Sequence, residues 1–103
     1  MYDPRKIVIF GGSGHAKAIV DIIESNNNFE LIGFIDKLIP QESIILNYRV
    51  IGDESLLSKL MYKYNFNKGV VGIGDNFVRS KVVDVVKKIA PDFQFINCIH
   101  HSA

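Results

Sequence analysis

The chain alternates between short apolar runs and longer stretches in which apolar residues recur at helical spacing. Residues 7–10 form a continuous and mostly β-branched apolar run, and similar runs follow at residues 29–35, 69–73 and 93–99. Buried runs without polar alternation are typical of strands in a parallel sheet. The pattern therefore predicts four strands over these ranges.

The stretches between these runs predict helices. Ala16, Ile19, Val20 and Ile23 share one helical face, with charged residues between them. Residues 53–64 and 76–89 show the same spacing, and an aspartate precedes each helical pattern as a candidate cap. Residues 37–49 have no clean period, so we predict a loop there with a short extended piece at residues 43–46.

Strands that alternate with helices require crossover connections and a parallel sheet. The predicted fold class is α/β, a small Rossmann-like three-layer domain with a parallel sheet of four or five strands. We expect the first strand to lie between the second and the strand at residues 69–73. The loops that end these three strands would then meet at one crevice.

Composition limits the classes of protein to consider. The 103 residues fit a single domain over residues 1–103, and 48% of them are apolar. The net charge of +1, without a basic face, argues against nucleic acid as a partner. The run before Gly11 is too short for a signal peptide or a membrane span, so we expect a cytoplasmic protein without a membrane partner.

Cysteine and histidine give no metal or disulfide signal. Cys98 is the single cysteine, so no intrachain disulfide can form, which agrees with a reducing compartment. His100 and His101 are adjacent and would point apart on an extended chain. We predict no metal site and no cofactor bound by this chain.

The glycine cluster is the strongest candidate site. The first predicted strand runs into Gly11, Gly12, Ser13 and Gly14, and a helix is expected to begin near His15. Backbone N–H groups and the positive end of a helix dipole favour a phosphate at such a place. We expect phosphates to approach Gly12, Ser13 and Gly14; the alternative is a tight turn without a ligand.

The loop is an incomplete dinucleotide fingerprint. Gly12 and Gly14 fit the first two positions of G-x-G-x-x-G, but the third position falls on Lys17. We expect a lysine there to keep the helix from packing close to the strand. The spacing does not fit a Walker loop either.

Two further strand ends carry candidate residues. Asp36 follows the second strand, where an acid commonly binds a ribose hydroxyl, although a solvated turn aspartate is a serious alternative. Gly74 follows the strand at residues 69–73 and would let a ring approach the backbone. A role as a helix cap explains Asp75 at least as well as contact with a ligand does. Arg79, in the following helix, can either reach a phosphate or be solvated. His15 can bind a ligand or a nearby carbonyl.

Five motifs in order resemble a known family. They are KIVIFGGSGHAK at residues 6–17, IGFID at 32–36, VIGD at 50–53, IGDN at 73–76 with Arg79, and IHHSA at 99–103. Together they resemble the N-terminal domain of the sialic acid O-acetyltransferase-like family of bacterial sugar acyltransferases. The resemblance covers nearly the whole chain.

The resemblance implies a function. In that family the N-terminal domain binds a nucleotide-sugar, usually a UDP-sugar, and a left-handed β-helix follows that binds acetyl-CoA, carries the catalytic histidine and holds a homotrimer together. The match implies that Ser13, Gly14 and His15 contact the nucleotide-sugar. It also implies that Asp36 and Lys37 contact its uridine or ribose, and that Gly74 lines the pocket.

The chain departs from the family pattern at two places. Lys37 stands where a second acid is usual, which leaves the preference for base and sugar open. At residues 99–103 the usual IHPSA reads IHHSA, and no hexapeptide repeat follows, so the acetyl-CoA site and a catalytic histidine would lie in a domain after residue 103. The chain is then an excised domain, which we favour, or a stand-alone one.

The sequence thus predicts the UDP-sugar-binding domain of an acetyl-CoA-dependent sugar N- or O-acetyltransferase, inactive by itself. Two alternatives remain from other classes. One is an NAD-binding module of an oxidoreductase or redox sensor, against which Lys17 and the short chain argue. The other is a protein–protein module with a vestigial nucleotide pocket.

Overall fold

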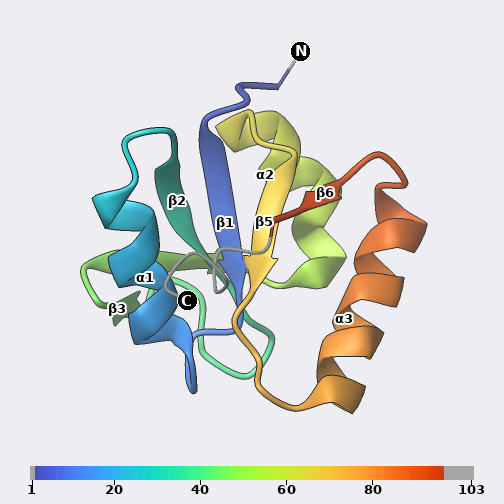
Figure 1. The fold of residues 1–103 in the computed structure, drawn as a ribbon. Helices are drawn as coiled ribbons and strands as arrows, with labels where there is room; N and C mark the ends of the chain where they lie inside the picture. Colours follow the sequence, from blue (N-terminus) through green and yellow to red (C-terminus); the bar gives the residue numbers. More distant parts are fainter. Residues whose placement is uncertain (1, 97–103) are drawn as a thin grey trace.

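The computed structural model of the chain describes residues 2–96. Strands and helices alternate along most of this range (Figure 1). The elements are β1 (Lys6–Phe10), α1 (Ala16–Ser25), β2 (Glu30–Ile35), β3 (Ile44–Ile45), β4 (Tyr48–Gly52), the 3₁₀ helix η1 (Glu54–Leu56), α2 (Leu57–Tyr64), β5 (Lys68–Val71), α3 (Asn76–Ile89) and β6 (Gln94–Phe95).

The strands form one sheet in the order β3-β4-β2-β1-β5-β6. Every neighbouring pair is parallel except β3 with β4. The prediction that the first strand lies between the second strand and the strand at residues 69–73 is confirmed, since β1 lies between β2 and β5. In register, Phe10 pairs with Ile35 on one side and with Val71 on the other, so these three strands end at the same edge.

Helices cover both faces of the sheet, which confirms the predicted α/β fold in three layers (Figure 1). Successive residues of β1 point to opposite faces. Ile7 and Ile9 pack in one apolar cluster with Ile19 and other residues of α1. Val8 and Phe10 belong to a second cluster, on the face of α2 and α3. The core is therefore split by the sheet into two apolar halves.

The segment predicted as a loop contains a hairpin, so the sheet has six strands rather than four or five. The short β3 falls within the extended piece expected at residues 43–46, but β4 was not predicted. Only Val50 and Ile51 of β4 are buried apolar residues, and the polar sequence before them hides the strand. β4 forms because it pairs in parallel with β2, with Phe34 opposite Val50, and the local sequence pattern does not indicate this pairing.

The last predicted strand is observed only in part. β6 covers Gln94–Phe95 and pairs with the start of β5, while residues 97–99 of the predicted strand lie outside the described residues. Phe93 is buried, and its ring packs against those of Phe10 and Phe95 at centroid distances of 5.6 and 5.1 Å. These aromatic contacts hold β6 beside β5. None of the helices in residues 2–96 is long and apolar enough to cross a membrane.

Candidate functional site

The glycine loop follows β1 at the edge of the sheet where β2 and β5 also end. Gly11 is buried with φ +99°, and its N–H donates to the Ile35 carbonyl at 2.9 Å. Gly14 also has a positive φ, of +64°. Residues with a Cβ atom rarely adopt these angles, so the turn between β1 and α1 depends on both glycines.

Gly12 is a point of close approach between two loops. A Cβ atom on Gly12 would lie 2.5 Å from Ile45 Cδ1 and 2.9 Å from Ile39 Cδ1. The segment between β2 and β4 therefore packs directly on this glycine. No local signal in the sequence indicates that Ile39 and Ile45 lie beside the loop, since the hairpin that carries Ile45 was not predicted.

Asp36 is the polar centre of this contact. Its Oδ2 accepts a hydrogen bond from the Gly12 N–H at 2.8 Å, and its Oδ1 accepts from the N–H groups of Leu38 and Ile39 at 2.7 and 3.1 Å. The half-buried carboxylate thus fixes the turn after β2 and joins that turn to the glycine loop. Lys37 follows it and is exposed.

His15 and Gly74 meet across the same edge of the sheet. A Cβ atom on Gly74 would lie 2.8 Å from His15 Nε2, so the imidazole lies directly beside the exposed glycine after β5. Ser13, Gly14 and His15 are all exposed. The structure therefore brings together the predicted residues from the glycine loop, the end of β2 and the segment after β5, with Gly12 in contact with Asp36 and His15 in contact with Gly74.

The amino end of α1 is available to an anion. No side chain accepts a hydrogen bond at its first turn, and that turn contains no acidic residue. By contrast, Asp75 caps α3 by accepting from the N–H groups of Phe77 and Val78 at 2.9 and 3.1 Å. The helix-cap interpretation of Asp75 is thus confirmed, whereas Ser13 does not cap α1.

The expectation for Lys17 is wrong. Its side chain points outward and forms an exposed ion pair with Asp21 at 3.1 Å. Ala16, which is 3% exposed, lies against the sheet instead. The small residue that faces the sheet is therefore Ala16, one position before the place of the third glycine in the fingerprint. Lys17 therefore carries no argument against a nucleotide at the loop.

Within residues 2–96 no cluster of histidine, cysteine, aspartate and glutamate could hold a metal ion. Cys98, His100 and His101 lie outside the described residues.

Comparison with known proteins identifies the family. The family model of the PglD N-terminal domain matches residues 6–86, which is most of the chain. The chain belongs to the PglD N-terminal domain family. The resemblance stated from the sequence is thereby confirmed. No curated protein matches the chain.

Solved structures show the same fold. A mutant of perosamine N-acetyltransferase from Caulobacter crescentus, in complex with CoA and GDP-perosamine, matches with a TM-score of 0.70 and 25% identity over 85% of this chain. The acetyltransferase domain of PglB from Neisseria gonorrhoeae, in complex with acetyl coenzyme A, matches with a TM-score of 0.67 and 24% identity, also over 85%. The chain spans 40% and 41% of the lengths of these two proteins.

An oxidoreductase shares the architecture. UDP-D-quinovosamine 4-dehydrogenase from Vibrio fischeri matches with a TM-score of 0.67 over 97% of this chain and 84% of its own length. The identity is 16%, so this match shows the fold alone.

Proposed function

We propose that this chain is the part of a sugar acetyltransferase that binds a nucleoside-diphosphate-linked amino sugar and presents its amino group for acetylation. The observation that carries the proposal is the amino end of α1, which no side chain caps, at the exposed residues Ser13, Gly14 and His15. Backbone N–H groups and the helix dipole can bind a diphosphate there without a cluster of basic side chains.

The neighbouring strand ends would contact the rest of the ligand. We propose that Asp36 and Lys37 lie beside the ribose or the base, and that Gly74 lines the pocket with the imidazole of His15. Asp36 already accepts three backbone N–H groups, but a carboxylate has about four lone-pair sites and can accept a ribose hydroxyl in addition.

Uridine is the base that the family resemblance favours, whereas the similar perosamine N-acetyltransferase binds GDP-perosamine. Transfer of the acetyl group from acetyl-CoA, and any trimer, would belong to a β-helix domain beyond this chain. The bases are best compared directly, by isothermal titration of the chain with UDP, GDP and NAD.

A charge placed at the helix end tests the binding mode. We expect His15→Glu to weaken UDP binding at least about tenfold, because a carboxylate would repel the diphosphate. The same variant should keep or slightly raise the stability of the fold, by about 0.5 kcal/mol, because an acid favours the positive end of a helix. The matched control is His15→Gln, which removes the imidazole without adding a charge.

Equal UDP affinities for His15→Glu and His15→Gln would remove the α1 amino end from the site. Tighter binding of NAD than of UDP or GDP would favour the oxidoreductase module instead. Failure of every nucleotide to bind the unmodified chain would contradict the proposed function.

A further inference from the structure

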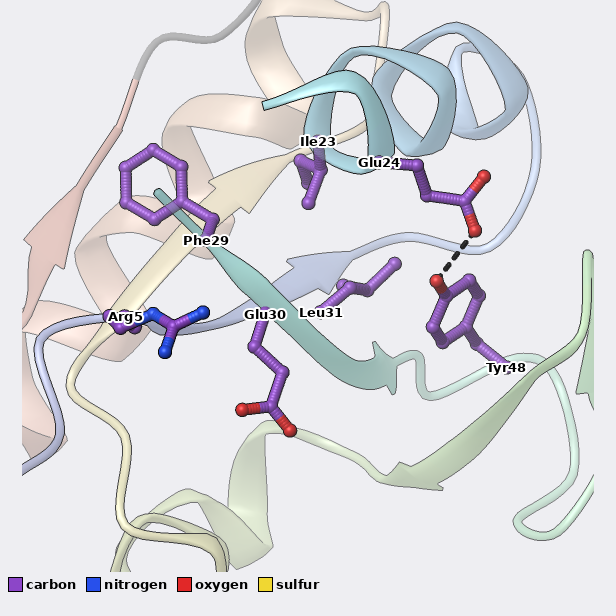
Figure 2. A pocket seen from close by; sticks show the side chains of 7 residues that line it. All are labelled: Arg5, Ile23, Glu24, Phe29, Glu30, Leu31 and Tyr48. Atoms are coloured by element: carbon purple, nitrogen blue, oxygen red, sulfur yellow. Dashed lines mark hydrogen bonds between the residues drawn. The ribbon is translucent and has the colours of Figure 1, made fainter. Parts of the chain in front are cut away.

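A hollow lies at the end of the sheet opposite the glycine loop. It has a volume of about 560 Å³ and is shown in Figure 2. Its lining comes from the amino ends of β1, β2 and β4 and from the last turn of α1, whereas the glycine loop follows the carboxyl end of β1. The lining residues are Arg5, Ile23, Glu24, Phe29, Glu30, Leu31 and Tyr48.

The floor of this hollow is apolar. Ile23 and Leu31 are buried, and the half-buried ring of Phe29 stands beside them. In Figure 2 the side chains of Ile23 and Leu31 lie between Arg5 on one side and Glu24 with Tyr48 on the other. A ligand seated on this floor would therefore have the Arg5 guanidinium at one end and the Glu24 carboxylate at the other, with the Glu30 carboxylate between them on the Arg5 side.

The charged groups of the lining are not paired with one another. The two ion pairs within residues 2–96 are Lys17 with Asp21 and Arg49 with Glu42, so neither Arg5 nor the glutamates of the hollow belong to one. The last turn of α1, which carries Glu24, also contains no basic residue. The negative end of the helix dipole therefore adds to the carboxylate and favours a cationic group on this side.

Tyr48 orients Glu24. The phenol donates a hydrogen bond to Glu24 Oε2 at 2.6 Å, which raises the pKa of Tyr48 to about 12 together with desolvation and the nearby charge. The hydrogen bond from the protonated phenol holds the Glu24 carboxylate in place. The second oxygen of Glu24 is left to accept from a ligand.

We infer that this hollow is a second binding site, for a small zwitterion whose carboxylate pairs with Arg5 and whose ammonium group pairs with Glu24 beside Tyr48, while its hydrocarbon part covers Ile23 and Leu31. A guanidinium binds a carboxylate through two parallel hydrogen bonds, which gives this end directional preference. The site is separate from the nucleotide-sugar site and goes beyond the proposed function.

The probe for this site is ε-aminocaproate, which carries the two charges at the ends of a flexible hydrocarbon chain. Titration of the isotope-labelled chain, followed through its backbone amide resonances, should give saturable shifts at Arg5, Glu24, Leu31 and Tyr48. Hexylamine and hexanoate are matched probes that each keep one of the two charges. Both should bind at least about tenfold more weakly, because one ionic hydrogen-bonded contact is lost.

Two variants locate the charges. Arg5→Gln should weaken ε-aminocaproate at least about tenfold but leave hexylamine unchanged, and Glu24→Gln should weaken ε-aminocaproate while leaving hexanoate unchanged. Glutamine at position 24 can still accept from the Tyr48 phenol, so the fold should be kept. Lys88→Gln and Asp84→Asn remove the same charges from exposed positions of α3 and should change nothing.

Shifts of equal size with the zwitterion and with both single-charge probes would overturn the inference, as would the absence of saturable shifts or unchanged affinity in both variants. A UDP titration reports on Ser13, Gly14 and His15 at the other edge of the sheet. The failure of one site can therefore be told from the failure of the other.

Discussion

Asp36 links two loops through one carboxylate. By residue type, an aspartate after a strand would contribute little to stability, since it lies outside the core. The structure changes this expectation, because three backbone N–H groups donate to Asp36 and one of them belongs to Gly12 in the glycine loop. The residue that the resemblance connects with the ligand is therefore also a structural residue.

We expect Asp36→Ala to lower the free energy of unfolding by about 2 kcal/mol, since it leaves half-buried N–H groups without their acceptor. Urea denaturation of the variant measures this. Asp84→Ala is a suitable control, because Asp84 is exposed and its removal should change stability by less than about 0.5 kcal/mol. Equal midpoints for the two variants would contradict the structural role of Asp36.

The Tyr48–Glu24 contact predicts a pH dependence. The folded-state pKa of Tyr48, about 12, lies above the ordinary value of 10.0. The contact therefore stabilises the fold fully below pH 10.0 and is lost as the pH rises toward about 12. An ultraviolet titration should show a tyrosine ionisation step near pH 12. In Glu24→Gln this late step should move to lower pH, and an unchanged late step would assign it to another tyrosine.

The β3–β4 hairpin is the element that the sequence conceals best. Its two-residue turn consists of Leu46 and Asn47, with φ of +51° and +74°. A turn of this kind is usually signalled by Asn-Gly or Asp-Gly, and a leucine in the first position gives no such signal. The hairpin nevertheless forms, because Ile45 packs on Gly12 and Tyr48 binds Glu24.

Leu46→Asn should stabilise the fold by about 0.5–1 kcal/mol, because asparagine tolerates the left-handed conformation better than leucine does. Thermal or urea unfolding of the variant measures the gain. Leu38→Asn is the control, since Leu38 is 85% exposed and has no positive φ, so the same change in polarity should give no comparable gain. A loss of stability in Leu46→Asn would mean that the apolar contacts of Leu46 matter more than its backbone strain.

The helices and central strands could be predicted from the sequence because each carries its own periodic signal. The continuous apolar run Ile7–Phe10 predicts a strand that is buried on both faces. Ala16, Ile19 and Ile23 recur at helical spacing and predict a helix. The meeting of Gly12, Asp36, His15 and Gly74 at one edge followed from the strand order. The hairpin could not be predicted, because β4 depends on pairing with β2, and neither could the packing of Ile39 on Gly12.

At the scale of the whole molecule, the sheet separates two surfaces of different chemistry. The glycine loop offers backbone N–H groups at the end where β1, β2 and β5 terminate. The hollow between Arg5 and Glu24 offers side-chain charges at the end where β1, β2 and β4 begin. The proposed acetyl acceptor would lie at the first of these surfaces.

We expect the 103-residue chain alone to show no acetyl transfer from acetyl-CoA to a UDP- or GDP-linked amino sugar. Within residues 2–96, His15 is the one histidine, and no carboxylate is hydrogen-bonded to its imidazole to orient it as a general base. Release of the CoA thiol, with a complete sugar acetyltransferase as positive control, measures the activity. Thiol release that requires both this chain and the amino sugar would show the expectation to be wrong.

The short β3 has a consequence for the behaviour of the protein at high concentration. It forms one border of the sheet and is two residues long, so an approaching strand from another molecule would find little backbone with which to pair. Pro40 and the left-handed Glu42 lie just before it and interrupt extended backbone on that side. On this border of the sheet the apolar central strands are thereby shielded from edge-to-edge pairing, although Ile44 itself is 65% exposed.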